Sequence, residues 1–292
     1  MINDFEHNWT VAGVTILYNP DIKVISNIKT YLNQVDKVFV YDNSEITNKN
    51  IVDKLLSIKR VVYTKNTKNM GIAYTLNKAA EVLVSQGYKY LFAMDQDSSA
   101  SEYLLREMLN AIEKDEKIGL VSPKIKQKKS KKNYNINPIV EVNVAITSGS
   151  LTRLSAHKKI SGYNEKLFID YVDHEYCLRL KSNGYKVIES GPEYINHELG
   201  NIKEKRILFW HVYPTNHKPA RLYYRTRNRL FVYNLYNNIF PDYVRKDKIS
   251  FIKEILKIFI FEKQKIQKCK MIIKGYLDYK SNVYGYQKSI LL

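Results

Sequence analysis

The sequence of 292 residues is 45% hydrophobic and 12% aromatic, enough to bury the core of one large domain with a small addition, which excludes an intrinsically disordered protein. Two cysteines are too few for a disulfide framework, the polar start MINDFEHNWT does not resemble a secretory signal, and no apolar stretch approaches the ~20 residues that span a bilayer, so we expect a cytoplasmic protein. The formal net charge is +18, but residues 201–292 hold 20 Lys and Arg against 6 Asp and Glu; no nucleic-acid-binding motif accompanies this charge, so we do not expect nucleic acid as a partner.

Strand-like and helix-like segments alternate through the first part of the chain. Short runs rich in β-branched and aromatic residues predict strands at 11–18, 37–42, 60–65, 88–95 and 118–125. Between them, apolar residues at helical spacing predict helices at 21–33, 47–58, 71–86 and 101–114. Such alternation is typical of an α/β fold, with a mostly parallel sheet and helices on both faces.

Polar residues follow the predicted strands at their carboxyl ends, where ligands bind in sheets of this class. They are Asn19 and Asp21, Asp42 and Asn43, Asn66 and Asn69, and Asp95 and Asp97. The last pair is the most informative, because two carboxylates so close together repel each other unless a cation lies beside them. A hard divalent cation completed by substrate phosphates would satisfy both. The alternative is a turn followed by a helix cap, for which Ser99 and Glu102 have capping-box spacing.

Three later segments complete the pattern. TSGSL at 147–151 is expected beside an acceptor pocket, although such residues also form ordinary turns. RLYYRTRNRL places Arg221, Arg225 and Arg229 on one helical face, suited to the phosphates of a donor or of a lipid-linked acceptor, or else simply solvated. The run KIKQKKSKKNYN at 124–135 predicts a flexible basic loop without chemistry.

Most of the basic charge lies in the final part of the chain. The stretch FIKEILKIFIFEKQKIQKCKMIIKG at 251–275 mixes apolar positions with frequent lysines, as in a helix that lies on anionic lipid. A core helix with a solvated lysine face is the alternative. We therefore expect a basic, amphipathic, helical C-terminal extension over residues 236–292.

Eight stretches in order carry a resemblance over about residues 10–235. They are VTILYNPD, VFVYDNSE, NTKNMGIAYTLNKA, FAMDQDS, TSGSL, GYNEKLFIDYVDHEYCLRLKSNGYKV, NHELG and RLYYRTRNRL. Together they resemble the family 2 glycosyltransferases of GT-A fold and, within them, bacterial rhamnosyltransferases of polysaccharide assembly. The resemblance implies a GT-A catalytic domain over 1–235, with a nucleotide-binding half at 1–125 and an acceptor-binding half at 139–235.

The resemblance also implies a set of donor-binding residues. Asp42 corresponds to the acid that recognises the nucleobase, with a strand-end turn as the alternative. Asp95 corresponds to the residue nearer the ribose, Asp97 to the metal ligand, and His197 to a histidine that can complete the metal site or can simply lie at the surface. The remaining nucleotide-sugar positions are Asn19, Pro20, Asn69, Gly71, Asn77 and, from the arginine stripe, Arg225.

The implied catalytic base is Asp173 in FIDYVDHEYCLRLKSNG. The family pattern carries two acids before this helix, and Val172 stands where the first is usual, so Asp170 and Glu175 remain alternatives. An acid at this place could also merely cap the helix. Ser148, Gly149 and Asp170 are the expected acceptor-binding residues.

These positions imply an inverting glycosyltransferase dependent on Mg²⁺ or Mn²⁺. The expected reaction transfers L-rhamnose from dTDP-L-rhamnose to a glycan on a polyprenyl-diphosphate lipid, at the inner face of the cell membrane, for a cell-surface polysaccharide. A UDP-sugar donor carrying galactofuranose, glucose or galactose is the alternative. Two other classes are a nucleotidyltransferase, disfavoured because YNPDIKV offers no glycine for a phosphate loop, and a membrane-associated binding protein without catalysis.

Overall fold

The computed structural model describes residues 10–125, 139–197, 205–207, 210–212 and 216–290. The polar start of the chain, most of the predicted basic loop at 124–135 and the last part of NHELG lie outside these residues. By contacts the chain divides into two compact units, which we describe separately. The first contains Met1–Tyr163 and Tyr176–His197, and the second contains Asn164–Glu175 and Glu198–Leu292. The boundary at residue 235 that the sequence suggests for the catalytic domain stays a prediction.

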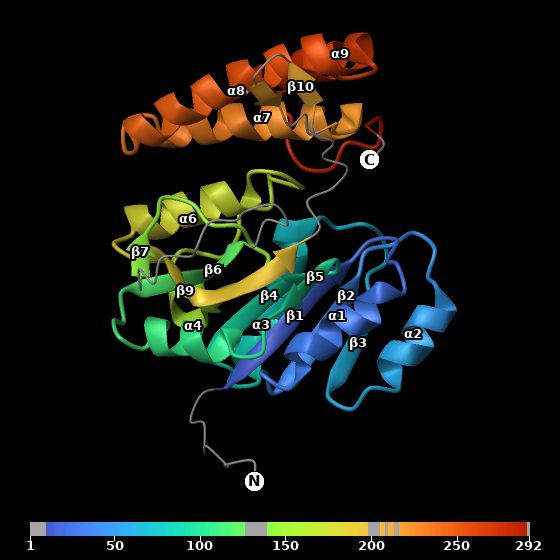
Figure 1. The fold of residues 1–292 in the computed structure, drawn as a ribbon, viewed down its shortest axis with the longest axis vertical. Helices are drawn as coiled ribbons and strands as arrows, with labels where there is room; N and C mark the ends of the chain where they lie inside the picture. Colours follow the sequence, from blue (N-terminus) through green and yellow to red (C-terminus); the bar gives the residue numbers. More distant parts are fainter. Residues whose placement is uncertain (1–9, 126–138, 198–204, 208–209, 213–215, 291–292) are drawn as a thin grey trace. The chain divides into compact units, whose positions relative to one another are not determined.

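The first unit is built on one mixed sheet of nine strands (Figure 1). Eight follow the order β3-β2-β1-β4-β8-β6-β9-β5, and β7 pairs with β9. The strands β1 to β4 are parallel, so their carboxyl ends share one edge, whereas β8 is antiparallel to both β4 and β6. The bounds are β1 Val11–Leu17, β2 Lys37–Asp42, β3 Val61–Lys65, β4 Tyr90–Asp95, β5 Ser98–Ala100, β6 Ile118–Ile125, β7 Ile139–Glu141, β8 Ser150–Arg153 and β9 Lys186–His197.

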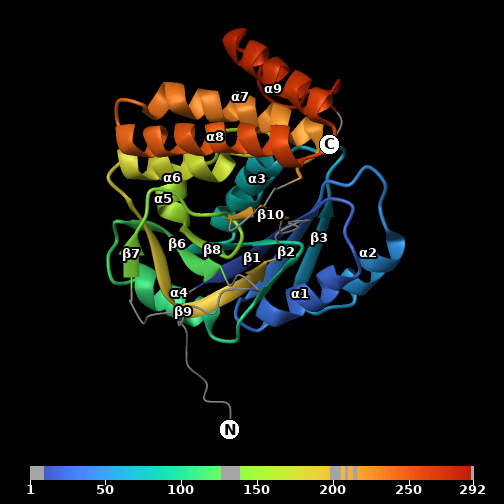
Figure 2. The same ribbon diagram turned by 45° about the horizontal axis from the view of Figure 1, so that its top comes forward.

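Helices cover both faces of this sheet (Figure 2). Helices α1, α2 and α4 lie on one face, and α3 and α5 lie on the other. The first group buries its apolar side against the strands in one large cluster, which contains Ile28, Leu55 and Met108. The bounds are α1 Lys23–Leu32, α2 Lys49–Leu56, α3 Ile72–Ser85, α4 Leu104–Ile112 and α5 Leu154–Lys159, with α6 Val172–Ser182 divided between the two units.

The predicted alternation is confirmed, with each of the nine predicted segments within three residues of an observed element. The capping box is wrong. Ser99 lies in β5 and pairs with Asn196 of β9, and α4 begins only at Leu104, after Tyr103, which makes no side-chain cap. The small polar residues after Asp97 therefore extend the sheet instead of starting a helix.

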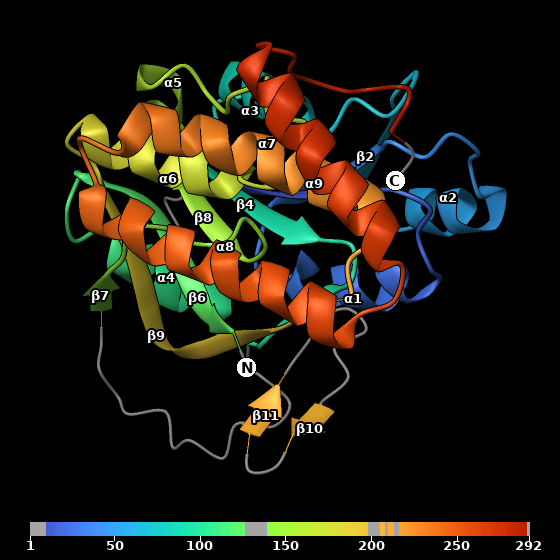
Figure 3. The same cartoon turned by 90° about the horizontal axis from the view of Figure 1, so that it is seen from above.

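The second unit contains α7 Pro219–Tyr236, α8 Pro241–Phe261, α9 Lys265–Lys280 and a small hairpin of β10 Lys205–Ile207 and β11 Trp210–Val212 (Figure 3). Helix α9 packs closely on α7 at Gly275, where a Cβ atom would lie 2.5 Å from the carbonyl oxygen of Tyr223. Only glycine permits such close backbone approach.

The basic helix predicted over 251–275 is in fact two helices. Helix α8 ends at Phe261, and Gln264 adopts a left-handed conformation (φ 57°) before α9 begins. A buried ion pair between Lys268 and Glu262, 2.5 Å long, holds this break, which no local breaker residue announces. No helix in the described ranges is long and apolar enough to cross a membrane.

Candidate donor site and catalytic residues

The carboxyl end of β2 presents Asp42, the predicted nucleobase contact. Its carboxylate is buried, accepts hydrogen bonds from the backbone N–H of Ser44 (2.8 Å) and the hydroxyl of Tyr63 (2.8 Å), and lies 3.4 Å from the Lys65 ammonium. Burial and the neighbouring Asp42 raise the pKa of the Tyr63 hydroxyl, which therefore stays protonated and donates. A carboxylate offers about four acceptor positions, so these contacts leave capacity for a further donor such as a pyrimidine N3–H.

A buried amide cluster fixes the loop before α3. The side chain of Asn43 donates to Thr75 Oγ1 (3.2 Å) and accepts from Asn66 (2.8 Å). Gly71 adopts φ 79°, a conformation that side chains disfavour, and its N–H donates to Asn69 Oδ1 (3.0 Å). The side chain of Asn43 also donates to the carbonyl of Gly71 (3.4 Å), so the structure joins the predicted residues Asn69 and Gly71 to the end of β2. The positive φ gives a reason for the glycine.

Asn77, five residues into α3, is engaged elsewhere in the first unit. Its side chain donates to the carbonyl of Tyr163 (2.9 Å) and accepts from the N–H of the same residue (2.7 Å). These bonds serve the fold, and the direct nucleotide contact implied for Asn77 stays a prediction.

The ends of β1 and β4 are clamped together by Gln96, the residue between the two aspartates. Its side chain accepts from the N–H of Tyr18 (2.9 Å) and donates to the carbonyl of Tyr18 (3.2 Å). Asn19, which precedes Pro20, has φ 47°, and its backbone N–H donates a hydrogen bond to Ser44 Oγ (2.8 Å). Sequence reasoning missed Gln96 and Ser44, since neither residue type signals a role that depends on a contact 78 or 25 positions away.

Asp95 and Asp97 are both exposed at this edge. Ser148, which is buried, accepts from the N–H of Asp95 (3.1 Å) and donates to Ser98 Oγ (2.9 Å). Gly149 adopts φ 76°, and a Cβ there would lie 2.8 Å from side-chain atoms of both Ile195 and Pro123. The N–H of Gly149 donates to the carbonyl of Ala93 (2.7 Å), so the two predicted acceptor residues Ser148 and Gly149 lie beside the end of β4.

The residues at this edge fit a hard divalent cation. Two exposed carboxylates supply oxygen ligands, and such ions take their remaining positions from phosphates and water. The backbone of His197 pairs with Ser98, directly after Asp97, although the side chain of His197 is not described. Among the described residues, no group of three or more His, Cys, Asp or Glu side chains lies close enough together to hold a metal unaided.

In the second unit, a strained turn precedes α6. Asp170 and Tyr171 both have positive φ (62° and 64°), which costs energy in non-glycine residues and is retained only where the surroundings enforce it. Asn228 of α7 donates to the carbonyls of Ile169 (2.8 Å) and Asp170 (3.0 Å). The carboxylate of Asp170 is bound by Arg221 at 3.1 Å, so an acceptor contact by Asp170 stays a prediction.

The predicted base Asp173 is half-buried in the first turn of α6. It accepts from the N–H of the next residue, His174 (2.9 Å), whose ring contacts the Tyr243 hydroxyl at 2.5 Å. Burial, then Asp247 and Asp173, raise the pKa of Tyr243, which keeps this hydroxyl protonated. Glu175 is buried and accepts from Tyr236 (3.0 Å). Of the two acids in α6 before Tyr176, Asp173 is the more accessible.

The arginine stripe lies on α7, as predicted, but its members bind carboxylates of the same unit. Arg221 pairs with Asp170, Arg225 with Glu254 (3.1 Å), and buried Arg229 with Glu254 and with Asp247 (3.1 Å each). A solvated face is therefore wrong for Arg229. The donor contact implied for Arg225 stays a prediction, because it would compete with Glu254.

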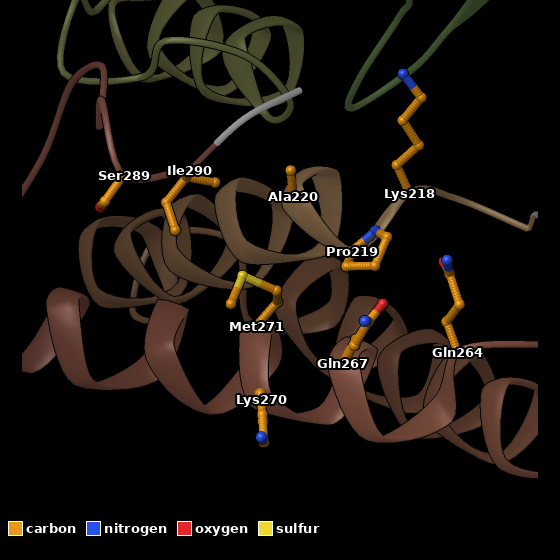
Figure 4. A pocket seen from close by; sticks show the side chains of 9 residues that line it. All are labelled: Lys218, Pro219, Ala220, Gln264, Gln267, Lys270, Met271, Ser289 and Ile290. Carbon is orange, nitrogen blue, oxygen red and sulfur yellow. The ribbon is translucent and has the colours of Figure 1, made fainter.

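A pocket of about 510 Å³ opens in the second unit, where the starts of α7 and α9 meet the chain end (Figure 4). Pro219, Ala220, Met271 and Ile290 form part of its lining, together with Lys218 and Lys270. None of the residues selected from the sequence lines it.

Comparison with known proteins decides the family. A sequence model described as glycosyl transferase family 2 matches residues 16–173, more than half of the chain and all of the edge from Asn19 to Gly149. The chain belongs to glycosyl transferase family 2. It is therefore a glycosyltransferase, which decides against the nucleotidyltransferase alternative.

Relatives of this glycosyltransferase agree with that assignment. It is 27% identical over 291 residues to the dTDP-rhamnosyl transferase RfbF of Shigella flexneri, covering 93% of this chain and 95% of the relative. Among solved structures, it resembles GalNAc-T7 with UDP, GalNAc and Mn²⁺ (TM-score 0.61, 12% identity, 82% of this chain and 50% of that one). It also resembles S. aureus TarS 1–349 in complex with UDP-GlcNAc (TM-score 0.58, 14% identity, 94% and 81%). These similarities confirm the predicted GT-A fold class, and the chain spans half the length of GalNAc-T7.

Proposed function

We propose that this glycosyltransferase transfers L-rhamnose from dTDP-L-rhamnose, with inversion and with Mg²⁺ or Mn²⁺, to a lipid-linked glycan of a cell-surface polysaccharide. The observation that carries the proposal is the connected edge of the sheet. Hydrogen bonds link Asp42 through Ser44 to Asn19, and link β1 through Gln96 to the Asp95 and Asp97 pair. At one end of this edge, Asp42 offers a carboxylate to the nucleobase of the donor. At the other end, Asp95 and Asp97 offer two carboxylates to a diphosphate with its bound metal ion.

The dTDP-rhamnose donor is supported by the similarity to RfbF over nearly the full length of both chains. A UDP-sugar is the second candidate, because TarS binds UDP-GlcNAc and shares the fold. Both pyrimidines present an N3–H to Asp42, so the base contact does not separate them. The lipid-linked acceptor also places the enzyme at the inner face of the cell membrane.

In the proposed reaction, the acceptor hydroxyl attacks the anomeric carbon and the bond to the diphosphate breaks. The carboxylate of Asp173 takes the hydroxyl proton, which makes it a general base. Asp97, with Asp95 beside it nearer the ribose, would hold the cation, which when bound would stabilise the departing diphosphate. A single displacement inverts the anomeric configuration.

The donor and the metal are tested together by nucleoside diphosphate release from dTDP- and UDP-sugars, with Mg²⁺ or Mn²⁺ and with EDTA. We expect release from dTDP-rhamnose to exceed that from each UDP-sugar, and EDTA to abolish it. Asp97→Asn should weaken the apparent metal affinity by at least ~100-fold. Asp115→Asn, a change of the same kind outside the edge, is the control. Faster release from a UDP-sugar would make that sugar nucleotide the donor in place of dTDP-rhamnose. Release that persists in EDTA would contradict the proposed dependence on a metal ion.

The base is tested with Asp173→Asn. We expect kcat to fall by about 10²- to 10⁴-fold, with donor affinity unchanged, because the variant cannot accept a proton. Asp170→Asn and Glu175→Gln are measured beside it. If Asp170→Asn lost more transfer than Asp173→Asn, Asp170 would be the base instead. A wild-type protein with no turnover on dTDP-rhamnose would overturn the proposed donor.

A further inference from the structure

Helix α8 turns two carboxylates toward its own unit, beside the buried apolar side chains of Val244 and Ile258. Asp247 and Glu254, seven residues apart and hence on one helical face, point to α7, where they bind Arg229 and Arg225. Asp247 also accepts from the hydroxyls of Tyr171 (2.7 Å) and Tyr233 (2.8 Å). The inner face of this helix thus holds two of its three acidic residues.

The opposite side of α8 is apolar. Five large apolar side chains are between 49% and 60% exposed. They are Ile249, Ile252, Leu256, Phe259 and Ile260, spaced three or four apart except at the last step. A helix of a water-soluble protein normally turns its large apolar residues inward, so five exposed ones along one side depart from that pattern. An exposed apolar stripe of this length indicates a binding surface.

The charges that flank this stripe are basic. Lys246, Lys248 and Lys253 are exposed, and the only exposed acid of α8 is Asp242 in its first turn, where it pairs with Arg245 (3.2 Å). Because the other two acids bind α7, the outward side of α8 offers apolar groups and cations, and its one carboxylate, Asp242, lies in the first turn and is paired with Arg245.

Helix α9 repeats this arrangement. Ile266, Ile273 and Leu277 are exposed on one side, separated by seven and four residues, and Lys270 lies among them. Its one carboxylate, Asp278, instead accepts from Tyr223 of α7 (2.6 Å) and lies 3.2 Å from Lys274. Two helices of the unit therefore share the same distribution of charge.

We propose that the outward face of α8, together with that of α9, binds the surface of an anionic lipid bilayer, with Leu256 and Phe259 inserted among the acyl chains. The apolar stripe matches the interior of the interface and the lysines match anionic headgroups. A second copy of this chain is the other occupant to consider. A symmetric contact would bring lysines of one copy against lysines of the other, which is unfavourable. The inference depends on the proposed lipid-linked acceptor in one respect only: the acceptor indicates which membrane is bound, namely the inner face of the cell membrane.

The test is flotation of the full chain with vesicles of phosphatidylcholine, with and without phosphatidylglycerol. Leu256→Gln combined with Phe259→Gln should weaken binding to the anionic vesicles by at least ~10-fold, because apolar area is lost from the interface. Leu56→Gln is the matched control: this leucine of α2 is 59% exposed, against 53% for Leu256. Point variants are used because truncation would remove α9, which packs on α7 at Gly275.

A second pair of variants tests the charge. Lys253→Gln should weaken binding to phosphatidylglycerol vesicles by about fivefold, and Lys54→Gln on α2 should not. Unchanged far-ultraviolet circular dichroism and melting would show that each variant is folded.

Binding of the Leu256 and Phe259 double variant equal to that of the wild type would overturn the proposal. So would a wild-type dimer in sedimentation that this double variant abolishes, since the face would then bind a second copy.

Failure of the inference is separable from failure of the proposed function. Nucleoside diphosphate release with a soluble acceptor is measured on the same preparations. We expect the α8 variants to retain it, because they lie outside the donor edge. Vesicle binding without any release would leave this inference standing and count against the proposed donor, and release without vesicle binding would overturn this inference and leave the donor standing.

Discussion

His157 shows how a single buried residue links the fold to pH. It lies in the first unit, where its ring contacts the Tyr176 hydroxyl (2.9 Å), and Tyr176 stacks on Tyr163 at 3.9 Å between ring centroids. Tyr163 is the residue whose backbone binds Asn77. Burial, and then the charge of Arg179, lower the pKa of His157 to about 4.

The resulting prediction concerns stability in mild acid. Between pH 6.5 and about 4 the unfolded chain binds a proton at His157 that the folded chain does not, so stability falls as the pH falls through this range. The loss attributable to this residue approaches about 3 kcal/mol. His157→Gln should flatten that part of the curve of unfolding free energy against pH, measured in urea. An unchanged slope would mean that other groups carry the acid dependence.

At the scale of elements, the ion pairs between α7 and α8 decide which way α8 faces. Arg229 is buried, and although burial opposes its charge, Tyr171, Glu254 and Asp247 raise its pKa. Its guanidinium carbon also lies 4.3 Å from the ring centroid of Phe251. Without this cation, Asp247 and Glu254 would lose the ion pairs that stabilise their carboxylates on the inward side of α8.

Arg229→Met should therefore be strongly destabilising. The variant leaves two carboxylates short of a cation, and breaking a buried ion pair typically costs about 3–5 kcal/mol. Arg245→Met is the control, because its pair with Asp242 is solvent-exposed and should contribute less than about 1 kcal/mol. Chemical unfolding gives both values. Adding Asp247→Asn to Arg229→Met should recover part of the loss, and no recovery would argue against the electrostatic cause.

At the scale of the whole molecule, donor binding should appear as stability. A ligand that binds only the folded state stabilises it by about 2.7 kcal/mol at 100 times its Kd. We expect dTDP with Mn²⁺ to raise the thermal midpoint, EDTA to reverse most of the rise, and Asp97→Asn to remove the metal dependence. Scanning calorimetry would measure this. A rise with dTDP that is equal with and without metal would mean that the nucleotide binds through Asp42 alone.

Much of the fold and part of the site could be predicted from the sequence. The strands at 11–18 and 37–42 and the helix between them were readable because the spacing of apolar residues is a local property of the chain. The convergence of Asn19, Asp42 and Asp95 on one edge followed as well, since parallel strands end on the same side. The site position Asp173 came from family resemblance and Arg225 from the helical spacing of the arginines, and the roles of both remain to be tested.

What only the tertiary structure decided are contacts between distant positions. Gln96 and Ser44 join strand ends, Ser99 belongs to a strand, Asn77 serves the backbone of Tyr163, and α8 turns its carboxylates inward. The sequence by itself determined the α/β alternation and the polar strand ends, because these depend on neighbours a few residues away. The partner of each side chain was decided by packing, because contacts across 18 to 97 positions leave no local pattern.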